Sequence, residues 1–524
     1  MQPQREETES LWKATSSIPS AESLSHDIKV DVCVVGAGMA GITTGWLLSR
    51  EGRRVAVLDS RDLAAGQTHR TSAHLSNAHD NFYSEVEKVH GLDGIRIAAE
   101  SHTAAIDTIE SAVHVLKIDC DFERLPGYLF CAPGDSQDVL DQEFDAATRA
   151  GLQGLEFCDR APIPHFETGR CLRYPNQARF HPLKYLTHLA GEIRRSGGQI
   201  FHQTAVKSVV GGSQPHVVTA GGQTVHAQAV VVATNTPIND RFAIHTKQAP
   251  YLTYVIGMPV PRGAVERALL WDTQEYYHYV RTHPVDDHTE MLLVGGEDHK
   301  AGQVTDQSER HARLEAWARE RFPMAGPIAY AWSGMVMETT DGGAFIGRNP
   351  GDDDNVYIAT GDSGMGMTHG TIAGLLLTDL IQGRQHPWAD FYDPSRKPIA
   401  GMAWRNFVSE NANLGQQYVR DWLSGSDDPE IARLATDEGT VVRSGLTKDA
   451  VYRDEQGNLH RCSAVCPHLG CIVHWNDLEK VWDCPCHGSR FDAYGAVMNG
   501  PAASPLARSN SEQTAAGGNR PSPN

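Results

Sequence analysis

The chain has 524 residues, which is more than one ordinary hydrophobic core accommodates and predicts two or more domains. Apolar residues make up 40% of it, as in globular proteins, and the formal net charge is −19. An acidic chain is repelled by nucleic acid and by anionic membrane surfaces, and no lysine- or arginine-rich run offsets this charge. We therefore expect no nucleic-acid partner and no integral membrane segment.

The first strong pattern follows a polar amino-terminal arm, residues 1–29. Val30–Val35 reads as a buried strand, a helix is predicted over Ile42–Arg50, and between them lie Gly36, Ala37, Gly38, Met39, Ala40 and Gly41. Glycines at these spacings permit a tight turn, let a pyrophosphate approach the backbone and allow close helix–strand packing. The helix amino terminus also attracts phosphate. This pattern explains the apolar run better than a membrane span does.

A second predicted strand, residues 54–58, ends at Asp59, whose carboxylate can accept a hydrogen bond from a ribose hydroxyl. This order of a strand, a glycine motif, a helix and a second strand that ends in an acidic residue predicts a Rossmann dinucleotide site. The motif alone does not distinguish NAD from FAD.

Three segments resemble the D-amino-acid oxidase and glycine oxidase-like FAD superfamily. They are residues 60–73, the strand end Ala233-Thr234-Asn235, and the glycine-rich turn 360–370 before a predicted helix. The resemblance implies FAD as the cofactor; an alternative for residues 60–73 is a Ser/Thr-rich surface loop. With the glycine motif, it implies that the cofactor contacts are Gly36, Gly38, Met39, Ala40, Gly41, Asp59, Ser60, Arg61, Gly66, Thr68, Thr71, Ser72, Val206, Thr234, Gly361, Gly364, Met367 and Thr368.

A β-rich region follows at residues 245–300. Tyr276–Arg281 alternates, so Tyr277, Tyr279 and Arg281 are predicted to share one face of a strand. An arginine flanked by tyrosines could hold a substrate carboxylate by a bidentate pair, although an edge strand with an exposed arginine fits equally well. No catalytic acid or base stands out, and the candidates are only Arg281, Tyr277, His74 and His369.

Near the carboxyl terminus, Cys466-Pro467-His468 and Cys484-Pro485-Cys486-His487 are separated by a short loop. Two thiolates and two imidazoles suit one metal centre, and zinc is the common occupant of such a set. However, each loop here mixes one Cys with one His, which fits a Rieske [2Fe–2S] centre.

The spacing resembles the Rieske signature of cytochrome bc-type proteins. It implies that the cluster ligands are Cys466, His468, Cys484 and His487, and that Cys471 and Cys486 form a disulfide. It further implies that Ser489 donates to a cluster sulfur, whereas Phe491 stands where high-potential members carry a tyrosine. Hydrogen bonds to the sulfurs raise the potential, so we expect a potential below the top of the Rieske range.

The predicted fold is an α/β Rossmann-type FAD-binding domain with a β-rich substrate domain, plus a small all-β Rieske domain. The expected FAD-dependent part is residues 30–397, with FAD-binding segments at about 30–82, 176–240 and 335–390 and substrate segments at about 83–175 and 241–334. A helical connector, 398–429, a Rieske domain, 430–506, and a disordered tail, 507–524, complete the chain.

Both resemblances imply a dehydrogenase that oxidises an amino acid, secondary amine or similar small molecule, with electrons passing from flavin to the cluster and then to an unidentified acceptor. The alternatives are a redox carrier or sensor without its own substrate and a flavin oxidase with a structural cluster. A Rieske oxygenase would need a mononuclear iron site, and no carboxylate-flanked histidine pair follows the cluster motif. Scattered cysteines and the lack of an export signal predict a cytoplasmic location.

Overall fold

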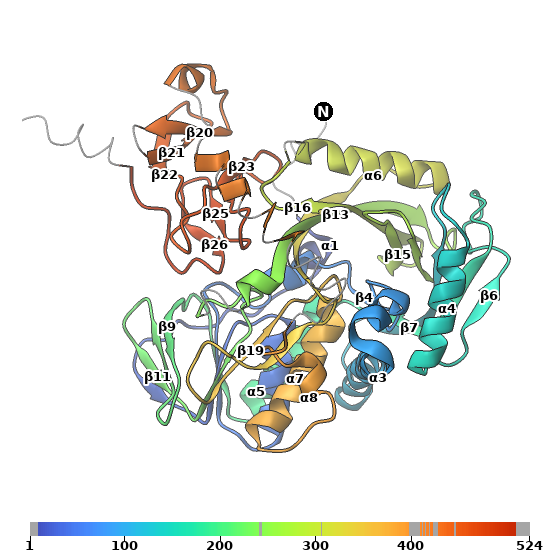
Figure 1. The fold of residues 1–524 in the computed structure, drawn as a ribbon, viewed down its shortest axis with the longest axis horizontal. Helices are drawn as coiled ribbons and strands as arrows, with labels where there is room; N and C mark the ends of the chain where they lie inside the picture. The colour runs from blue at the N-terminus through green and yellow to red at the C-terminus, as the bar shows by residue number, and fades with distance from the viewer. Residues whose placement is uncertain are drawn as a thin grey trace, which may run out of the picture.

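The computed structural model describes residues 9–239, 244–304, 306–397, 428–444 and 447–509, with short pieces at 409–410, 412–413, 416–418 and 420–422. Figure 1 shows a lower α/β layer, a roof sheet above it and a small carboxyl-terminal domain, drawn orange to red, against that roof. Among the described residues, no helix has the length and apolar character that crossing a membrane requires.

The α/β layer is built on a six-stranded sheet that is parallel except at its β18 edge. Its strands, in spatial order, are β18 (Phe345–Arg348), β19 (Val356–Thr360), β12 (Ala229–Val232), β2 (Val32–Val35), β3 (Val55–Leu58) and β8 (Gln199–Phe201). The chain leaves this sheet after Phe201, and Val206 begins a strand of another sheet.

Side chains of β2 alternate between two apolar cores, as a strand buried on both faces requires. Val32 and Val34 pack with three helices, and Cys33 and Val35 pack against a second sheet. The helices are α2 (Met39–Arg50), α5 (Pro182–Arg195) and α7 (Gly366–Ile381). The second sheet has the order β1 (Ile28–Lys29), β11 (Thr224–His226), β10 (His216–Thr219) and β9 (Val206–Val210). Helix α2 begins three residues earlier than predicted, inside the glycine motif.

The roof is a mixed nine-stranded sheet. Its path is β17 (Tyr330–Thr339), β13 (Gln248–Pro261), β16 (Thr289–Lys300), β15 (Tyr279–Pro284), β14 (Leu269–Asp272), β5 (Glu123–Phe130), β7 (Cys171–Arg179) and β4 (His74–Leu75), with β6 (Glu156–Cys158) paired to β7. Helix α6 (Gln307–Arg321) covers its outer face (Figure 1), where Leu314 and Ala318 join the sheet's core. The flanking helices are α3 (Tyr83–Leu116), α4 (Asp138–Ala150) and α8 (Ala389–Tyr392).

The carboxyl-terminal domain contains two small antiparallel sheets. One has β20 (Glu438–Ser444), β21 (Thr447–Arg453) and β22 (Leu459–Ser463); the other has β23 (His474–Asn476), β24 (Val481–Asp483), β25 (Arg490–Asp492) and β26 (Val497–Asn499). A short 3₁₀ helix, η3 (Asp428–Arg433), precedes them. Of the expected connector, the described residues between 409 and 422 are helical and residues 428–429 begin η3; the others, like the tail beyond 509, lie outside the described residues.

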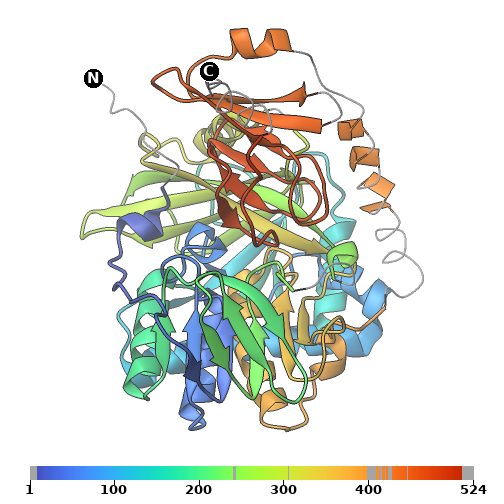
Figure 2. The ribbon, with the colours of Figure 1, turned by 90° about the vertical axis from the view of Figure 1, so that its left-hand side faces the viewer.

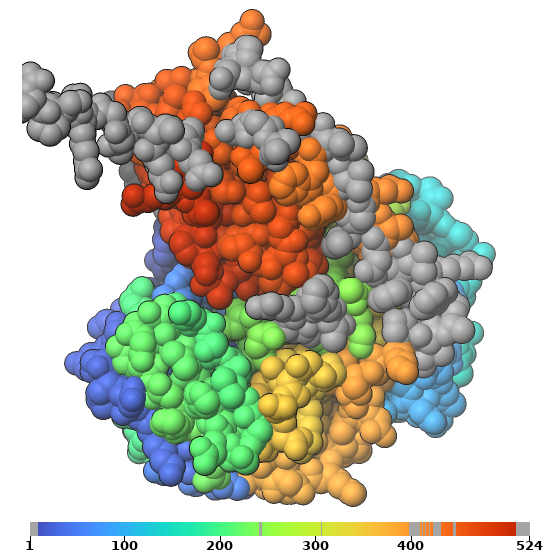
Figure 3. Space-filling model, turned by 60° about the vertical axis from the view of Figure 1, so that its left-hand side comes forward, coloured from blue at the N-terminus to red at the C-terminus, as the bar shows by residue number. Residues whose placement is uncertain are grey.

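The carboxyl-terminal domain is fastened to the roof by Glu479, whose side chain is only 3% exposed. Its carboxylate pairs with Arg70 and with Arg490, at 2.9 Å each, and accepts a hydrogen bond from Ser333 on β17. Figures 2 and 3 show the red domain seated directly on the green and yellow segments beneath it. Burial alone raises the pKa of Glu479, but the attraction of Arg490 and Arg70 outweighs it and lowers that pKa to about 2.

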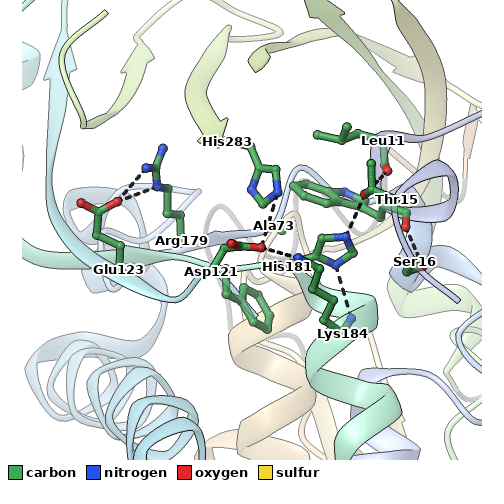
Figure 4. Close-up of polar contacts among 12 residues, drawn as sticks. Leu11, Thr15, Ser16, Ala73, Asp121, Glu123, Arg179, His181, Lys184 and His283 are labelled. Atoms are coloured by element: carbon green, nitrogen blue, oxygen red, sulfur yellow. Dashed lines mark hydrogen bonds and ion pairs between the residues drawn. The ribbon is translucent and has the colours of Figure 1, made fainter. Parts of the chain in front are cut away.

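The amino-terminal arm is docked onto the α/β layer through helix α1 (Leu11–Ala14). Trp12 is fully buried, its indole Nε1 donates to the Thr71 carbonyl at 2.7 Å, and the rings of His181 and His283 lie 5.1 and 5.0 Å from it. Figure 4 shows Thr15 pointing toward His181, where its Oγ1 lies 3.0 Å from Nε2. The arm therefore braces the loop that contains Thr71.

Replacing Trp12 with alanine should cost about 3–5 kcal/mol in the free energy of unfolding, because it leaves a large cavity and an unpaired Thr71 carbonyl. Denaturant unfolding checks this, with the exposed neighbour Lys13→Ala as the matched control, expected within about 0.5 kcal/mol of the parent. Equal, small losses in the two variants would contradict a docked arm.

Glu479 also predicts a pH dependence of domain docking. Its pKa falls from the ordinary value of 4.5 to about 2, so the carboxylate stabilises the docked protein above pH 4.5 and that stabilisation is lost as the pH falls toward 2. The contribution is about 3 kcal/mol, at roughly 1.4 kcal/mol per pH unit. The difference in unfolding free energy between the parent and Glu479→Gln should be constant above pH 5 and shrink below pH 4.5. A difference that grows on acidification would contradict this assignment.

Candidate functional site

A cavity of about 520 Å³ lies between the six-stranded sheet, the roof and the carboxyl-terminal domain. Its volume is in the range of ligand and cofactor sites. The expected cofactor contacts that line it are Gly36, Gly38, Met39, Ala40, Asp59, Ser60, Arg61, Gly66, Thr68, Thr71, Ser72, Val206, Thr234, Gly364, Met367 and Thr368. Residues from three distant parts of the chain thus meet around one cavity.

Gly41 and Gly361, two of the expected cofactor contacts, do not line the cavity and serve packing instead. A Cβ on Gly41 would lie 1.9 Å from the Gly36 carbonyl oxygen, so only glycine lets α2 approach the turn so closely. Gly361 has φ +73°, and a Cβ there would lie 2.5 Å from Thr339 Cγ2. Their place in the motif reflects backbone packing rather than ligand contact.

Asp59 organises the glycine turn from the end of β3. Its Oδ2 accepts from the Ala37 N–H at 2.7 Å and its Oδ1 from the Arg61 N–H at 2.9 Å. Burial raises the pKa of this carboxyl, and the two backbone N–H groups oppose that shift. Thr68 completes this end of the cavity by accepting from the Met39 N–H at 3.1 Å.

The side-chain amide of Asn235, in the turn after β12, is a buried donor without an acceptor among the described residues. Asn235, with φ +66°, lines the cavity, and its Nδ2 has no hydrogen-bond partner among the described residues. A buried polar atom left without a partner is costly, which indicates that a ligand atom completes this site. Together with the glycine turn and the helix α2 amino terminus, this donor fits the phosphate- and ribose-rich body of FAD.

Arg281 was a candidate for holding a substrate carboxylate, and the structure places it elsewhere. It is 1% exposed, does not line the cavity and donates to the carbonyls of Ala73, Ser72 and Phe180. Its guanidinium lies over the ring of Trp12, at 5.3 Å. A buried guanidinium needs acceptors for its N–H groups, and Arg281 finds them in the loop that contains Ser72 and Ala73. Arg281 therefore stabilises this loop, where Figure 4 labels Ala73.

The other three candidates do line the cavity. Tyr277 is not on the predicted strand, because Tyr276 adopts φ +61° and β15 begins only at Tyr279; its hydroxyl donates to Asp80 at 2.6 Å. His74 lies 2.9 Å from the Ser72 hydroxyl, and His369 lies 2.9 Å from the Asp362 carbonyl. Burial lowers the pKa of His74 to about 3 and that of His369 to about 4, so both rings are neutral at physiological pH.

Five acidic side chains that line the same cavity were missed by the sequence reasoning. One of them, Asp272, is paired with His278 at 3.0 Å; the other four, called the cavity carboxyls here, are Asp80, Asp298, Glu338 and Asp362. Burial raises the pKa of Asp80 and Asp362 to about 6 and that of Asp298 to about 7, and it raises the pKa of Glu338 well above its ordinary value. No local motif links them, since they come from segments far apart in the sequence.

The expected metal ligands come together at the tip of the carboxyl-terminal domain. The rings of His468 and His487 lie 5.0 Å apart, and the buried thiol of Cys484 hydrogen-bonds to Cys466, which lowers the pKa of Cys466 to about 7. His487 Nδ1 is buried without a hydrogen-bond partner among the described residues, as a metal-ligating nitrogen would be before its metal binds. Two sulfurs and two imidazoles therefore fit a Rieske cluster.

The disulfide between Cys471 and Cys486 is confirmed and ties the two ligand loops together, with a Cα–Cα distance of 6.5 Å. Within the described residues, its sulfurs and that of Cys484 lie within 4.8 Å of one another. The Cys466 N–H also donates to the Cys471 carbonyl at 2.8 Å. The ligand loops are thus held in position by covalent and backbone bonds of the protein itself.

The histidine side of this tip faces the rest of the protein. His245, in the 3₁₀ helix η2 (His245–Lys247), lies 4.6 Å from the ring of His468 and 4.9 Å from that of His487. The loop after β26 continues the contact, because Gly500 packs near Ile238 and the Ala502 N–H donates to the Ser489 hydroxyl at 3.0 Å. Strand β26 and the loop after it, residues 497–503, are called the cluster loop here. The cluster loop contributes to the lining of the cofactor cavity.

Comparison with known families agrees with both halves of the site. Residues 31–380 match the model of the FAD dependent oxidoreductase family, and residues 429–510 match that of the Rieske [2Fe-2S] domain. The chain is 31% identical over 503 residues to a putative Rieske 2Fe-2S iron-sulfur protein, YhfW, of Bacillus subtilis, covering 96% of this chain and 97% of that protein.

Two further similarities concern the first part of the chain. It is 27% identical to gamma-glutamylputrescine oxidoreductase of Escherichia coli over 409 residues, 76% of this chain and 94% of that protein. The L-proline dehydrogenase structure from P. horikoshii shares the fold, with a TM-score of 0.60 and 18% identity over 71% of this chain and 98% of that one.

Removal of the Ser489 hydroxyl should lower the cluster's reduction potential. The hydroxyl hydrogen-bonds to Cys466, and a bond of about 1 kcal/mol that favours the reduced cluster corresponds to about 40 mV for one electron. A redox titration of Ser489→Ala followed by EPR checks this, with the exposed Ser504→Ala as control. An unchanged potential in Ser489→Ala would show that this hydroxyl does not tune the cluster.

Proposed function

Because this chain belongs to the FAD dependent oxidoreductase family and carries a Rieske [2Fe–2S] domain, we propose that it is a dehydrogenase of a small amine or amino acid that passes electrons through the cluster to an external acceptor. When bound, FAD supplies the acceptor for a hydride from the C–H bond beside the nitrogen, and the [2Fe–2S] cluster supplies a one-electron outlet.

The observation that carries this proposal is that the cluster loop forms part of the wall of the cofactor cavity. Residues 497–500 line the cavity together with the glycine turn at Gly38, although the two segments belong to different domains. His487 is 5% exposed and turned toward His245. A cluster domain docked with its imidazoles toward the flavin-binding domain supports internal electron transfer.

The cavity also holds groups suited to preparing an amine. An amine must be neutral before it loses a hydride, so a nearby group must take up its proton. Asp362, whose pKa burial raises to about 6, can exchange a proton with such a substrate near neutral pH. His74 and His369 remain neutral, and Tyr277, held by Asp80, presents a rigid aromatic wall. These roles of the cavity residues are part of the proposal.

One observation favours a second candidate, an oxidase whose cluster is structural. Because the cluster loop is part of the cavity wall, the domain would be needed for the cofactor site even if no electron passed through it. The two candidates differ in whether substrate reduces the cluster.

Anaerobic mixing with an amine or amino acid substrate separates them. The proposal predicts flavin bleaching followed by the EPR signal of a reduced Rieske cluster. In Glu479→Gln, weaker docking should slow cluster reduction about tenfold or more relative to flavin bleaching, since removing one partner of a buried ion pair costs about 3–5 kcal/mol. The exposed neighbour Asp477→Asn is the control and should behave as the parent.

Bleaching without any cluster signal in the parent protein would favour the oxidase. No bleaching with any amine or amino acid would reject a substrate dehydrogenase and favour a carrier or sensor.

A further inference from the structure

The cavity carboxyls come from both sheets that border the cavity. Asp298 and Glu338 lie on the roof strands β16 and β17, Asp80 follows the roof strand β4, and Asp362 follows β19 of the six-stranded sheet. The groups are close to the turn at Gly364, where a Cβ would lie 1.9 Å from Asp80 Oδ2. Each of the other three carboxyls also raises the pKa of Glu338, as neighbouring negative charges do.

The arginine side chains that line the cavity interact with groups other than the cavity carboxyls. Among the described residues, the arginines that line the cavity are Arg61 and Arg70. Arg61 accompanies Asp59 at the glycine-turn end, and Arg70 is bound by Glu479 and the Ser333 carbonyl. Arg310 attracts Asp298 from α6, but its guanidinium is paired with Asp306 at 3.0 Å. The arginines of the cavity lining are thus engaged elsewhere, and the cavity carboxyls have neutral donors such as the Tyr277 hydroxyl and the Met337 N–H as partners.

Asp298 retains an open acceptor. Its Oδ1 is buried and has no hydrogen-bond partner in the described part of the chain, and the residue lines the cavity. A buried carboxylate oxygen without a donor is energetically costly unless a ligand supplies one. An ammonium group, with three N–H donors and a positive charge, matches such an acceptor.

A substrate carboxylate would be poorly accommodated here. It would meet four acidic groups, and Arg281, which the sequence suggested as its anchor, is occupied by backbone carbonyls outside the cavity. Like charges in a low-dielectric cavity repel strongly. The charge pattern therefore favours a substrate that carries an additional positive charge over a simple amino acid.

We propose that Asp298 and Glu338, two of the cavity carboxyls, bind the ammonium group of an aliphatic diamine or polyamine, at the end remote from the C–H bond that is oxidised. This inference rests on the proposed amine dehydrogenase function and specifies its substrate class. The remote ammonium group is chemically unchanged by the reaction. Its role is to place the neutral amine at the other end beside the flavin, with Asp298 and Glu338 determining specificity.

The first experiment compares unbranched substrates of matched length in the flavin- and cluster-loaded protein: a diamine, the corresponding monoamine and the corresponding ω-amino acid. Anaerobic flavin bleaching is measured against concentration. We expect the diamine to half-saturate at a concentration at least about tenfold below the monoamine, since a charge-assisted hydrogen bond contributes about 1.5–3 kcal/mol. The ω-amino acid should be the poorest of the three.

The second experiment removes charge from the binding site. Asp298→Asn and Glu338→Gln should each weaken diamine binding about tenfold or more while changing monoamine binding less than about twofold. Glu297→Gln is the matched control, because Glu297 adjoins Asp298 on β16 but pairs with Arg313 outside the cavity. It should leave the preference for the diamine intact.

A binding measurement that needs no turnover makes the test independent of the chemistry. Calorimetric titration of diamine and monoamine into dithionite-reduced protein, which cannot oxidise either ligand, should show the same preference and the same loss in the two variants. Equal affinity for the two ligands in the parent protein, or equal effects of the variants on both, would overturn the cationic site. If amines bleach the flavin without a diamine preference, the inference fails while the proposed function stands. If no compound bleaches the flavin, the proposed function fails. The calorimetric comparison of diamine with monoamine then tests the cationic site on its own.

Discussion

The buried carboxylate of Glu479 is the contact on which the two-domain arrangement depends. It belongs to the cluster domain, yet it is enclosed between Arg70 of the flavin-binding domain and Arg490 of its own domain, with Ser333 as a further donor. A buried charge is tolerated only when its partners are complete. The tight packing of Gly488 against Met335 depends on the same docked position, since a Cβ on Gly488 would lie 2.6 Å from the Met335 sulfur.

Docking brings the cluster loop of the carboxyl-terminal domain into the wall of the cofactor cavity. The imidazole of His487 is almost wholly buried, and its ring lies 4.9 Å from that of His245 in the flavin-binding domain. An external acceptor therefore has little access to that ring in the docked state. Electrons leaving the cluster must exit by another side of the small domain or after it moves.

Local patterns predicted much of the site. The glycine turn at Gly36 and Gly38 and the ligand loops around Cys466 and Cys484 could be recognised because each function depends on residues close together in sequence. The predicted strand was wrong at Tyr277, because Tyr276 has a positive φ and β15 begins at Tyr279, although Tyr277 still lines the cavity. Arg281 is on the strand but donates to the carbonyls of Ala73 and Phe180, contacts that no local pattern announces.

The remainder depends on long-range contacts that have no sequence signature. Arg70 and Glu479 are 409 residues apart, and the cavity carboxyls are distributed from Asp80 to Asp362. Each of these acids stands in an ordinary strand or turn, so its environment is set only when the roof closes over the α/β layer. Trp12 is similar, because an isolated aromatic residue in a polar arm does not reveal its neighbours.

The wall contributed by residues 497–503 means that the two domains are not interchangeable modules. A cluster domain transplanted from another protein would bring a loop of different shape and would thereby remodel the compartment that holds the flavin. Substitutions in this loop are consequently constrained by two partners at once, the iron–sulfur centre behind it and the organic cofactor in front of it. The boundary between the domains in sequence is thus not a boundary between their functions.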